Sequence, residues 1–262
     1  MTAARRILLL GGVDPCGGAG ITADAVVASL HGVEPLPVAL VLTVQNRRAF
    51  TSWSPVRDAD WRAAFAAACA DGDVHAIKTG LLGSAASVAA VADALAPFRG
   101  KVPIVVDPVF GATAGGHAAT EDVVAACRER LVPLATVLTP NVPEARALFG
   151  EDVRSALALG AGAVLHKGGH AEGEFATDVL HTAAAERRFA RRRLPVGPVH
   201  GTGCALATSL ACWLAHGADA ALASQRAGDW LWSRLAALGP PTDGLPRPVP
   251  LGGAQPVVIT NP

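Results

Sequence analysis

The sequence predicts an α/β protein in three layers, with a mostly parallel central sheet and helices on both of its faces. Short apolar, β-branched segments alternate with alanine-rich segments of helical length from residue 6 to about residue 238. Alternation of this kind is typical of a parallel sheet whose crossover helices cover both faces. Polar residues also follow most of the predicted strands. Because open α/β sheets bind ligands at the carboxyl ends of their strands, this pattern also predicts the edge that carries the site.

Length and composition narrow the classes of function. We expect the 262 residues to form a single domain over residues 1–262. Lys and Arg together number 22, as do Asp and Glu, so no net charge attracts nucleic acid or an anionic membrane. No apolar run approaches the roughly 20 residues of a membrane helix, and no secretory signal is evident. The five cysteines form no C-x-x-C pair, which favours reduced thiols and a cytoplasmic location.

The first predicted strand is followed by a glycine-rich loop. Residues 6–10 form an apolar run, residues 11–20 contain five glycines, and a helix is predicted from there to His31. Such a succession places a ligand at the end of the first strand. The loop lacks both the ending of a Walker A motif and the spacing of G-x-G-x-x-G, so we expect a small polar substrate here. A connecting loop without a ligand is the alternative.

The remaining elements are predicted from apolar runs, capping residues and turn residues. Further strands are expected at 36–43, 74–78, 102–106, 136–138 and 163–166. Helices are expected at 61–70, from a Ser84 cap to 96, at 121–130, from 144 to 148 and at 218–238. A small hairpin is expected over 176–194, and the tail over 239–262 is rich in Pro and Gly, with an edge strand at 257–260.

Seven polar or charged residues lie near the carboxyl ends of successive predicted strands. They are Asp14, Gln45, Lys78, Asp107, Asn141, Glu144 and Lys167. Because those strand ends meet at one edge of a parallel sheet, we expect the seven to share one site. The hairpin arginines Arg187, Arg188 and 191–193 form either a solvated face or a surface that attracts an anionic ligand. Trp230 and Trp232 are interpreted as packing residues.

The stretch from His200 to Cys204 (His-Gly-Thr-Gly-Cys) runs directly into an apolar, helix-forming segment. The first N–H groups of a helix have no partner inside it and carry the positive end of the helix dipole, so Gly201, Thr202 and Gly203 are candidates for an anion cradle. We expect the helix N-terminus to lower the pKa of the Cys204 thiol and to make it a candidate base. A glycine-rich turn that enters a buried helix is the alternative.

Seven motifs resemble those of the hydroxymethylpyrimidine/phosphomethylpyrimidine kinases and occur in the same order. They lie at 12–24 (like D-P-S-G-G-A-G-I-x-A-D), 44–46 (A-Q-N), 77–82 (K-I-G-M-L), 106–109 (V-D-P-V), 138–144, 167–170 and 200–204. The chain is therefore identified as a member of this family, whose fold is ribokinase-like. In the thiamine branch of that fold, a cysteine stands where sugar kinases have aspartate, and Cys204 matches it.

The resemblance implies ATP-dependent phosphorylation of 4-amino-5-hydroxymethyl-2-methylpyrimidine, and then of its monophosphate, for thiamine diphosphate synthesis. ATP and Mg²⁺ are the implied cofactors, and a homodimer is the implied assembly. On the substrate side, Gln45 would read the aminopyrimidine ring, and Gly12, Asp14 and Val44 would help line its pocket. The other implied residues are Lys167 and Gly168 along the ATP phosphates, Asn141 and Glu144 around Mg²⁺ through water, Gly201, Thr202 and Gly203 as the anion hole, and Cys204 beside the hydroxymethyl group.

One departure from the family pattern bears on the second step. Family members commonly have Ala-Lys-Ser-Gly-Asp after the V-D-P-V motif, but this chain has Thr113 in place of the usual lysine. If that lysine steadies the phosphate of the monophosphate substrate, the second phosphorylation is weak here.

Three other functions remain open at this point. The first is a pyridoxal or pyridoxine kinase on the same fold, and the second is a pyrimidine-binding relative without catalysis. The third is a thiol enzyme in which Cys204 is the nucleophile and His200, four residues earlier, its partner.

Overall fold

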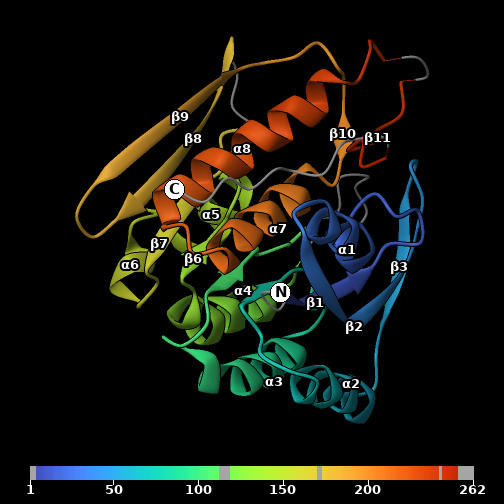
Figure 1. The fold of residues 1–262 in the computed structure, drawn as a ribbon, viewed down its shortest axis with the longest axis vertical. Coiled ribbons are helices and arrows are strands. Elements are labelled where there is room, and N and C mark those ends of the chain that lie inside the picture. Colours follow the sequence, from blue (N-terminus) through green and yellow to red (C-terminus); the bar gives the residue numbers. More distant parts are fainter. Residues whose placement is uncertain (1–3, 112–118, 170–172, 242–243, 253–262) are drawn as a thin grey trace.

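The computed structural model describes residues 4–111, 119–169, 173–241 and 244–252, and Figure 1 shows the fold. The expected edge strand at 257–260 and the Thr113 loop therefore lie outside the described residues. Within the described ranges, no helix is both long enough and apolar enough to span a membrane.

A nine-stranded sheet forms the centre of the molecule, with the strand order β3-β2-β1-β4-β5-β6-β7-β8-β9. The six strands from β2 through β1 to β7 run parallel, whereas β3, β8 and β9 are antiparallel to their neighbours. The strands are β1 (Arg5–Val13), β2 (Val33–Gln45), β3 (Phe50–Pro55), β4 (Ala76–Thr79), β5 (Ile104–Val106), β6 (Val137–Leu138), β7 (Ala163–His166), β8 (Phe175–Thr182) and β9 (Glu186–Arg192).

Helices cover both faces of this sheet, which confirms the predicted three layers (Figure 1). The first layer contains α1 (Gly20–Leu30), α7 (Thr202–Ala215) and α8 (Ala220–Ala236). The second contains α2 (Asp58–Ala70), α3 (Ala85–Leu95), α4 (Glu121–Ala126), α5 (Val142–Phe149) and α6 (Ser155–Ala158).

Strand β1 shows why the sheet strands read as continuous apolar runs. Ile7 and Leu9 pack into the cluster with α1, α7 and α8, while Leu8 and Leu10 pack into the cluster on the opposite face. All four side chains are at most 1% exposed. Successive side chains of a strand point to opposite faces, so a strand covered on both faces needs apolar residues at every position.

Several elements differ from the prediction. Strand β3 was not expected, because five of its six residues are exposed or only half-buried at the sheet edge and carry no apolar pattern. Strands β10 (Val199–His200) and β11 (Arg247–Pro248) form a separate parallel pair, and each has only two residues. Such a pair leaves no periodic signal in the sequence. The helix expected over 121–130 changes after Ala126 into a π-helical turn, Cys127–Leu131.

A buried histidine lies in the layer of α1, α7 and α8. His31 is 0% exposed and packs between two tryptophans, with its ring centroid 5.7 Å from that of Trp213 and 5.0 Å from that of Trp230. Neither ring nitrogen has a hydrogen-bond partner within the described part of the chain. Burial, with the nearby His216 and Arg234 adding to it, lowers the pKa of His31 to about 4.

We expect His31 to make the protein less stable in mild acid. The unfolded chain binds a proton at this residue below pH 6.5, whereas the folded chain does so only near pH 4, so stability is lost as the pH falls through that window. The shift corresponds to about 3 kcal/mol of unfolding free energy. Urea unfolding between pH 8 and pH 4 gives the unfolding free energy as a function of pH. Below pH 6.5 this free energy should fall less steeply for His31→Phe than for the unaltered protein, and above pH 7 the two slopes should be equal. Equal slopes throughout would contradict the assignment.

Candidate functional site

A cleft of about 910 Å³ runs along the carboxyl ends of the central strands. All seven polar residues predicted to share a site line it, from Asp14 after β1 to Lys167 after β7. The prediction that the seven residues gather in one place is therefore confirmed, and their individual roles stay predictions. The residues from His200 to Cys204 form the wall of this cleft at the N-terminus of α7.

The glycine-rich loop after β1 packs directly against the start of α7. Gly201, the residue before the helix, has φ +81°, and a Cβ at this position would lie 1.8 Å from the carbonyl oxygen of Gly18. Only glycine fits such a contact and such a backbone conformation. Among the described residues, no side chain caps the helix, and its first residues, Thr202 and Gly203, line the cleft. This is the geometry of an anion cradle.

Asp14 and His200 connect the same two loops through their side chains. His200 Nε2 donates a hydrogen bond to Asp14 Oδ2 at 2.9 Å. The same carboxylate accepts the backbone N–H groups of Cys16 (2.9 Å) and Ala19 (3.0 Å). Burial works to raise the pKa of Asp14, but His200 and these N–H groups outweigh it and hold the pKa below its ordinary value. The hydrogen bond between them fixes the orientation of the His200 ring and joins the two loops.

At one end of the cleft, Gln45 is oriented by a short chain of hydrogen bonds. Its Nε2 donates to Thr43 Oγ1 at 2.9 Å, and that hydroxyl donates to the carbonyl of Val13 at 2.8 Å. Gly12 also lines the cleft. Val44 does not, because alternate residues of β2 point to opposite faces and its side chain is 57% exposed on the other one. The expected contribution of the Val44 side chain to the pocket is therefore wrong.

At the end of the cleft away from Gln45, Lys167 is the central charged residue. Its Nζ donates to Asp107 Oδ1 at 2.8 Å and lies 3.8 Å from Glu144 Oε2. A Cβ added at Gly203 would be 3.2 Å from the same ammonium, so Lys167 also borders the anion cradle. Burial works to raise the pKa of Asp107, but Lys167 and Lys78 outweigh it and keep the carboxylate charged.

Asn141 and Glu144 form a capping box at the start of α5. Asn141 Oδ1 accepts from the Glu144 N–H at 2.9 Å, and Glu144 Oε2 accepts from the Asn141 N–H at 2.8 Å. Burial raises the pKa of Glu144 to about 7, and Lys167 acts against this rise. The two residues that the sequence assigns to Mg²⁺ are thus also structural residues of this helix.

The oxygen atoms at this end fit a hydrated Mg²⁺ ion. Asp107 Oδ2 is buried and has no hydrogen-bond partner within the described residues. The carboxylates of Asp107 and Glu144 both lie beside the ammonium of Lys167. Mg²⁺ prefers one or two carboxylates, phosphate oxygens and retained water. The described residues contain no group of three or more His, Cys, Asp and Glu able to hold a metal. The ion would therefore depend on phosphate oxygens for its other ligands.

The expected low pKa of Cys204 is wrong for this structure. Burial raises the pKa of its thiol to about 11, although the ammonium of Lys78 acts in the opposite direction. The side chain lies at the floor of the cleft among charged neighbours that include Asp24 and Asp107, whose negative charges disfavour a thiolate. At neutral pH the residue is accordingly a thiol.

Gly168 packs against β8, and the cleft is lined by the glycine that follows it. Gly168 faces β8, because its N–H donates to Asp178 Oδ1 at 2.9 Å and a Cβ there would lie 2.0 Å from the carbonyl of Thr177. Gly169 lines the cleft instead. Arg193 donates to the carbonyls of Gly169 (2.8 Å) and Gly168 (3.2 Å) and so holds this turn.

Arg191 anchors β9 to α8. Its guanidinium donates to Asp229 Oδ1 at 3.0 Å and to the carbonyl of Gln225 at 2.9 Å. A Cβ at Gly228 would lie 2.3 Å from the same guanidinium, so a larger residue there would require the Arg191 side chain to shift. Arg191, Arg192 and Arg193 all line the cleft, whereas Arg187 and Arg188 lie outside it. The hairpin arginines therefore divide between a structural role at the cleft and a solvated face.

Beyond the arginines, the cleft has an apolar end that the sequence did not predict. Trp232 lines it, is 38% exposed, and donates from Nε1 to the carbonyl of Arg192 at 2.8 Å. The interpretation of Trp232 as a packing residue is thus wrong, while Trp230 is 7% exposed and does pack. The other apolar residues of this end include Leu194, Val196, Leu231 and Leu235.

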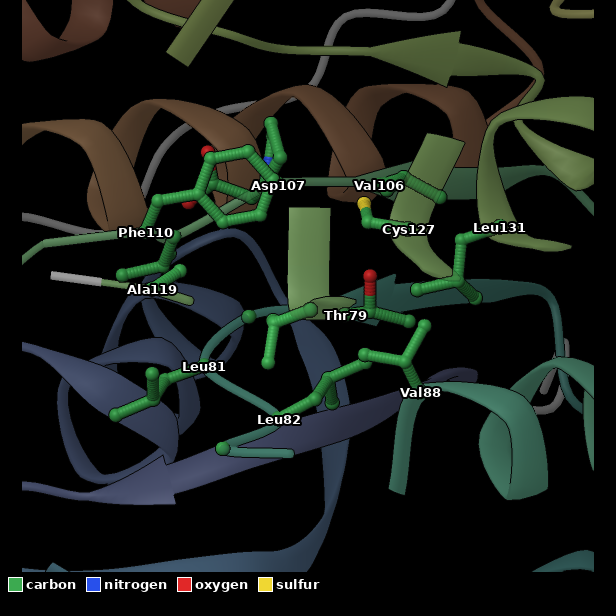
Figure 2. A pocket seen from close by; sticks show the side chains of 15 residues that line it. Thr79, Leu81, Leu82, Val88, Val106, Asp107, Phe110, Ala119, Cys127 and Leu131 are labelled. Carbon is green, nitrogen blue, oxygen red and sulfur yellow. The ribbon is translucent and has the colours of Figure 1, made fainter. Parts of the chain in front are cut away.

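A second, small cavity lies behind the cleft. It holds about 20 Å³ and is lined by Asp107 together with apolar residues of α3, α4 and the π-helical turn. Figure 2 shows the Thr79 hydroxyl directed toward Cys127, with Leu82, Val88 and Leu131 around it. Asp107 therefore forms part of the wall between the two spaces.

Comparison with known proteins decides the family. A family model described as phosphomethylpyrimidine kinase matches residues 14–244. The chain belongs to the phosphomethylpyrimidine kinase family. A hydroxymethylpyrimidine/phosphomethylpyrimidine kinase of Rhizobium meliloti is 37% identical over 241 residues, which cover 88% of this chain and 90% of that protein.

Solved structures confirm the fold of this member of the phosphomethylpyrimidine kinase family. A pyridoxal kinase of Bacillus subtilis in complex with ADP has a TM-score of 0.85 at 27% identity and covers 94% of this chain and 98% of that one. A phosphomethylpyrimidine kinase of Clostridium difficile has a TM-score of 0.76 at 26% identity, covering 87% and 98%. The pyridoxal kinase shares the fold, while the family model and the curated relative favour the pyrimidine over pyridoxal.

A fully buried ion pair supports the floor of the cleft beneath Cys204. Lys78 Nζ donates to Asp24 Oδ2 at 2.7 Å, and Thr208 Oγ1 donates to the other carboxylate oxygen at 2.7 Å. All three residues are at most 1% exposed. This network joins β4, α1 and α7, and it sets the distance between the sheet and the helix that carries the anion cradle.

We expect removal of one charge from this pair to be costly and removal of both to be tolerated. Lys78→Met leaves Asp24 buried without a cation, which should cost about 3–5 kcal/mol of unfolding free energy. Adding Asp24→Asn should recover most of that loss, since no buried charge then remains. Urea unfolding of the two single variants and the double variant gives the coupling energy. Additive losses would show that the pair does not act as one unit.

Proposed function

We propose that this chain transfers phosphate from ATP to 4-amino-5-hydroxymethyl-2-methylpyrimidine, and to its monophosphate, in thiamine diphosphate synthesis. One observation supports this most directly. A single cleft joins a hydrogen-bonding end that contains Gln45 to an end that contains Lys167 and the start of α7. A kinase of the family needs an acceptor site and a phosphate site side by side in one cleft, because phosphoryl transfer depends mainly on positioning and on charge stabilisation.

The pyrimidine is proposed to lie against the glycine-rich loop and Gln45. The amide of Gln45 has donors and an acceptor, and Thr43 fixes its orientation, which suits the edge of an aminopyrimidine ring. Gly12 and Leu81 are close enough that a Cβ at residue 12 would lie 3.2 Å from the leucine. The ring would therefore rest on a narrow, shaped floor, with its hydroxymethyl group directed toward Cys204 and the anion cradle.

ATP is proposed to occupy the other half of the cleft. Its phosphates would extend from Lys167 and Gly169 to the N–H groups of Thr202 and Gly203. Those donors and the ammonium are held in place before the reaction, so they can stabilise the charge on the transferring phosphoryl group without reorganisation. The apolar end around Trp232 would take the adenine ring, since a heterocycle stacks well on such a surface.

Mg²⁺ is proposed to sit between the nucleotide and the pair of Asp107 and Glu144, with Asn141 contacting it through water. When bound, the ion would neutralise part of the phosphate charge. The two carboxylates are held apart from free solvent, and Lys167 lies between them at 2.8 and 3.8 Å. The homodimer implied by the family resemblance stays a prediction that light scattering can check.

Cys204 is proposed to shape the pocket and to contact the hydroxymethyl group as a thiol, and not to act as a resident thiolate base. With its pKa raised to about 11, only a minute fraction is ionised at pH 7.5. A general base usually contributes about 10²–10⁴-fold to the rate.

We therefore expect Cys204→Ser to retain kcat within about tenfold, because a hydroxyl can replace a neutral thiol as a hydrogen-bonding group. For the unaltered protein, kcat should not rise tenfold per pH unit between pH 7.5 and 9.5. Initial rates over this range test both statements, with Cys69→Ser, far from the cleft lining, as the matched control. A unit slope that disappears in Cys204→Ser would instead identify the thiolate as the base.

The second phosphorylation is expected to be the weaker one. Thr113 carries no charge to steady the phosphate of the monophosphate substrate. We expect kcat/KM for the monophosphate to be at least about tenfold below that for the alcohol, the size of effect that one lost charged contact produces. Thr113→Lys should raise the value for the monophosphate and leave that for the alcohol unchanged. Equal turnover of both substrates by the unaltered protein would contradict this.

The proposed function is tested by a coupled ADP-release assay with Mg²⁺ on three acceptors: the hydroxymethylpyrimidine, its monophosphate and pyridoxal. Turnover of the hydroxymethylpyrimidine, with a KM that Gln45→Ala raises, supports the proposal. Turnover of pyridoxal alone would keep the kinase and reject the pyrimidine pocket. Tight binding of the pyrimidine without turnover of any acceptor would identify a non-catalytic relative.

A further inference from the structure

The segment after α8 returns to the cleft and pairs with the strand that leads into the anion cradle. In this two-stranded parallel sheet, Val199 is aligned with Arg247 and His200 with Pro248 (Figure 1). Residue 200 is followed directly by Gly201, so β10, the partner of β11, ends one peptide before the turn that leads into α7. The family model ends at residue 244, and the segment 245–251 lies beyond that match.

Arg247 makes a dense set of contacts with the backbone in this region. Its Nη2 donates to the carbonyls of Val196 and Gly239, each at 2.7 Å, and Nη1 lies 3.4 Å from the carbonyl of Pro240. Its own N–H donates to the carbonyl of Pro198 at 3.1 Å. One guanidinium fork thus joins the segment before β10 to the segment after α8, which its fixed planar geometry allows.

The neighbours of Arg247 extend these contacts to both loops of the cleft. A Cβ at Gly18 would lie 3.4 Å from Pro248 and 2.7 Å from His200, so the glycine-rich loop packs on this strand pair. Arg47, two residues after Gln45, donates to the carbonyl of Pro246 at 2.9 Å.

Val249 fixes the other end of the segment. It is 4% exposed and belongs to a small core with Val27 of α1, Ala205 of α7 and Trp230 of α8. The segment is therefore attached to all three helices of one layer, and it cannot shift without moving the start of α7 or leaving an apolar side chain in water.

We propose that Arg247 is a positioning residue for phosphoryl transfer: through β10 it holds the Gly201–Gly203 turn in the orientation that binds the transferring phosphoryl group. Arg247 contacts neither substrate in this scheme. Its effect is on kcat. N–H groups that are slightly displaced lose more binding energy to the phosphoryl group in the transition state than in the ground state. The proposal rests on the proposed kinase function of the same cleft.

The test compares Arg247→Ala and Arg247→Lys with Arg128→Ala. Arg128 lies on the opposite face of the sheet, where its side chain is 42% exposed and its ion pair with Glu129 is 3.8 Å long. We expect Arg247→Ala to lower kcat at least about tenfold with little change in KM, since displacement of a cradle by a distant change costs up to about 10²-fold. Arg247→Lys should lower kcat by a smaller factor, and Arg128→Ala should leave kcat unchanged.

Two further measurements separate positioning from general destabilisation. Guanidinium ion at low millimolar concentration should restore part of kcat to Arg247→Ala, because it can refill the space between the same carbonyls, and should leave Arg128→Ala unchanged. Hydrogen exchange should become faster in Arg247→Ala across residues 199–206 at a temperature where the fold is intact. If Arg247→Ala does not fold, the kcat of Arg247→Lys decides the question.

An unchanged kcat in folded Arg247→Ala, or in Arg247→Lys if that is the only folded variant, overturns the proposal. So does a loss of kcat without rescue and without faster exchange at 199–206. If the unaltered protein phosphorylates none of the acceptors, the proposed function has failed, and the exchange measurement alone then decides whether Arg247 orders the cradle.

Discussion

The contact between Gly201 and the carbonyl of Gly18 sets the geometry of the whole cleft. Two loops more than 180 positions apart in the sequence meet there at a distance that leaves no room for a Cβ. The Asp14–His200 hydrogen bond then fixes their relative orientation. In the proposed phosphoryl transfer, one loop would belong to the acceptor end and the other to the phosphate end, so this contact would help to set the distance between the two halves of the reaction.

The charged residues beneath this contact are arranged in two separate pairs. Lys78 pairs with Asp24, whose other carboxylate oxygen accepts from Thr208, and Lys167 pairs with Asp107; all four charged residues line the cleft and are at most 7% exposed. A buried pair of this kind adds little net stability compared with apolar residues, but loss of one partner is expensive. The first pair therefore specifies the position of α7, and the second keeps a cation available for phosphate. The two lysines differ in what they contact, because Lys78 bonds to a carboxylate of α1 while Lys167 lies close to Gly203 at the start of α7.

Much of this arrangement could be predicted from the sequence. The alternation of apolar runs and helical segments predicted the parallel sheet, and the polar residues after the strands predicted the cleft, because strand ends in such a sheet converge regardless of detail. Three features could not be predicted. Trp232 lines the cleft from α8, Val44 faces away because of its register in β2, and Arg247 is joined to β10 by a strand of only two residues. Each depends on tertiary geometry that carries no periodic signal.

The thiol of Cys204 shows how magnitudes decide between two opposing effects. The N-terminus of a helix favours a negative charge by about 0.3–1 kcal/mol, or up to about 2 kcal/mol when partly buried, which corresponds to at most about 1.5 pKa units. Burial beside the carboxylates of Asp24 and Asp107 acts in the opposite direction and raises the pKa to about 11. The cradle at the start of α7 is therefore better suited to bind an anion brought by a ligand than to create one on its own side chain. That division fits a reaction in which the donors already point at the phosphoryl group and the protein needs to move little charge itself.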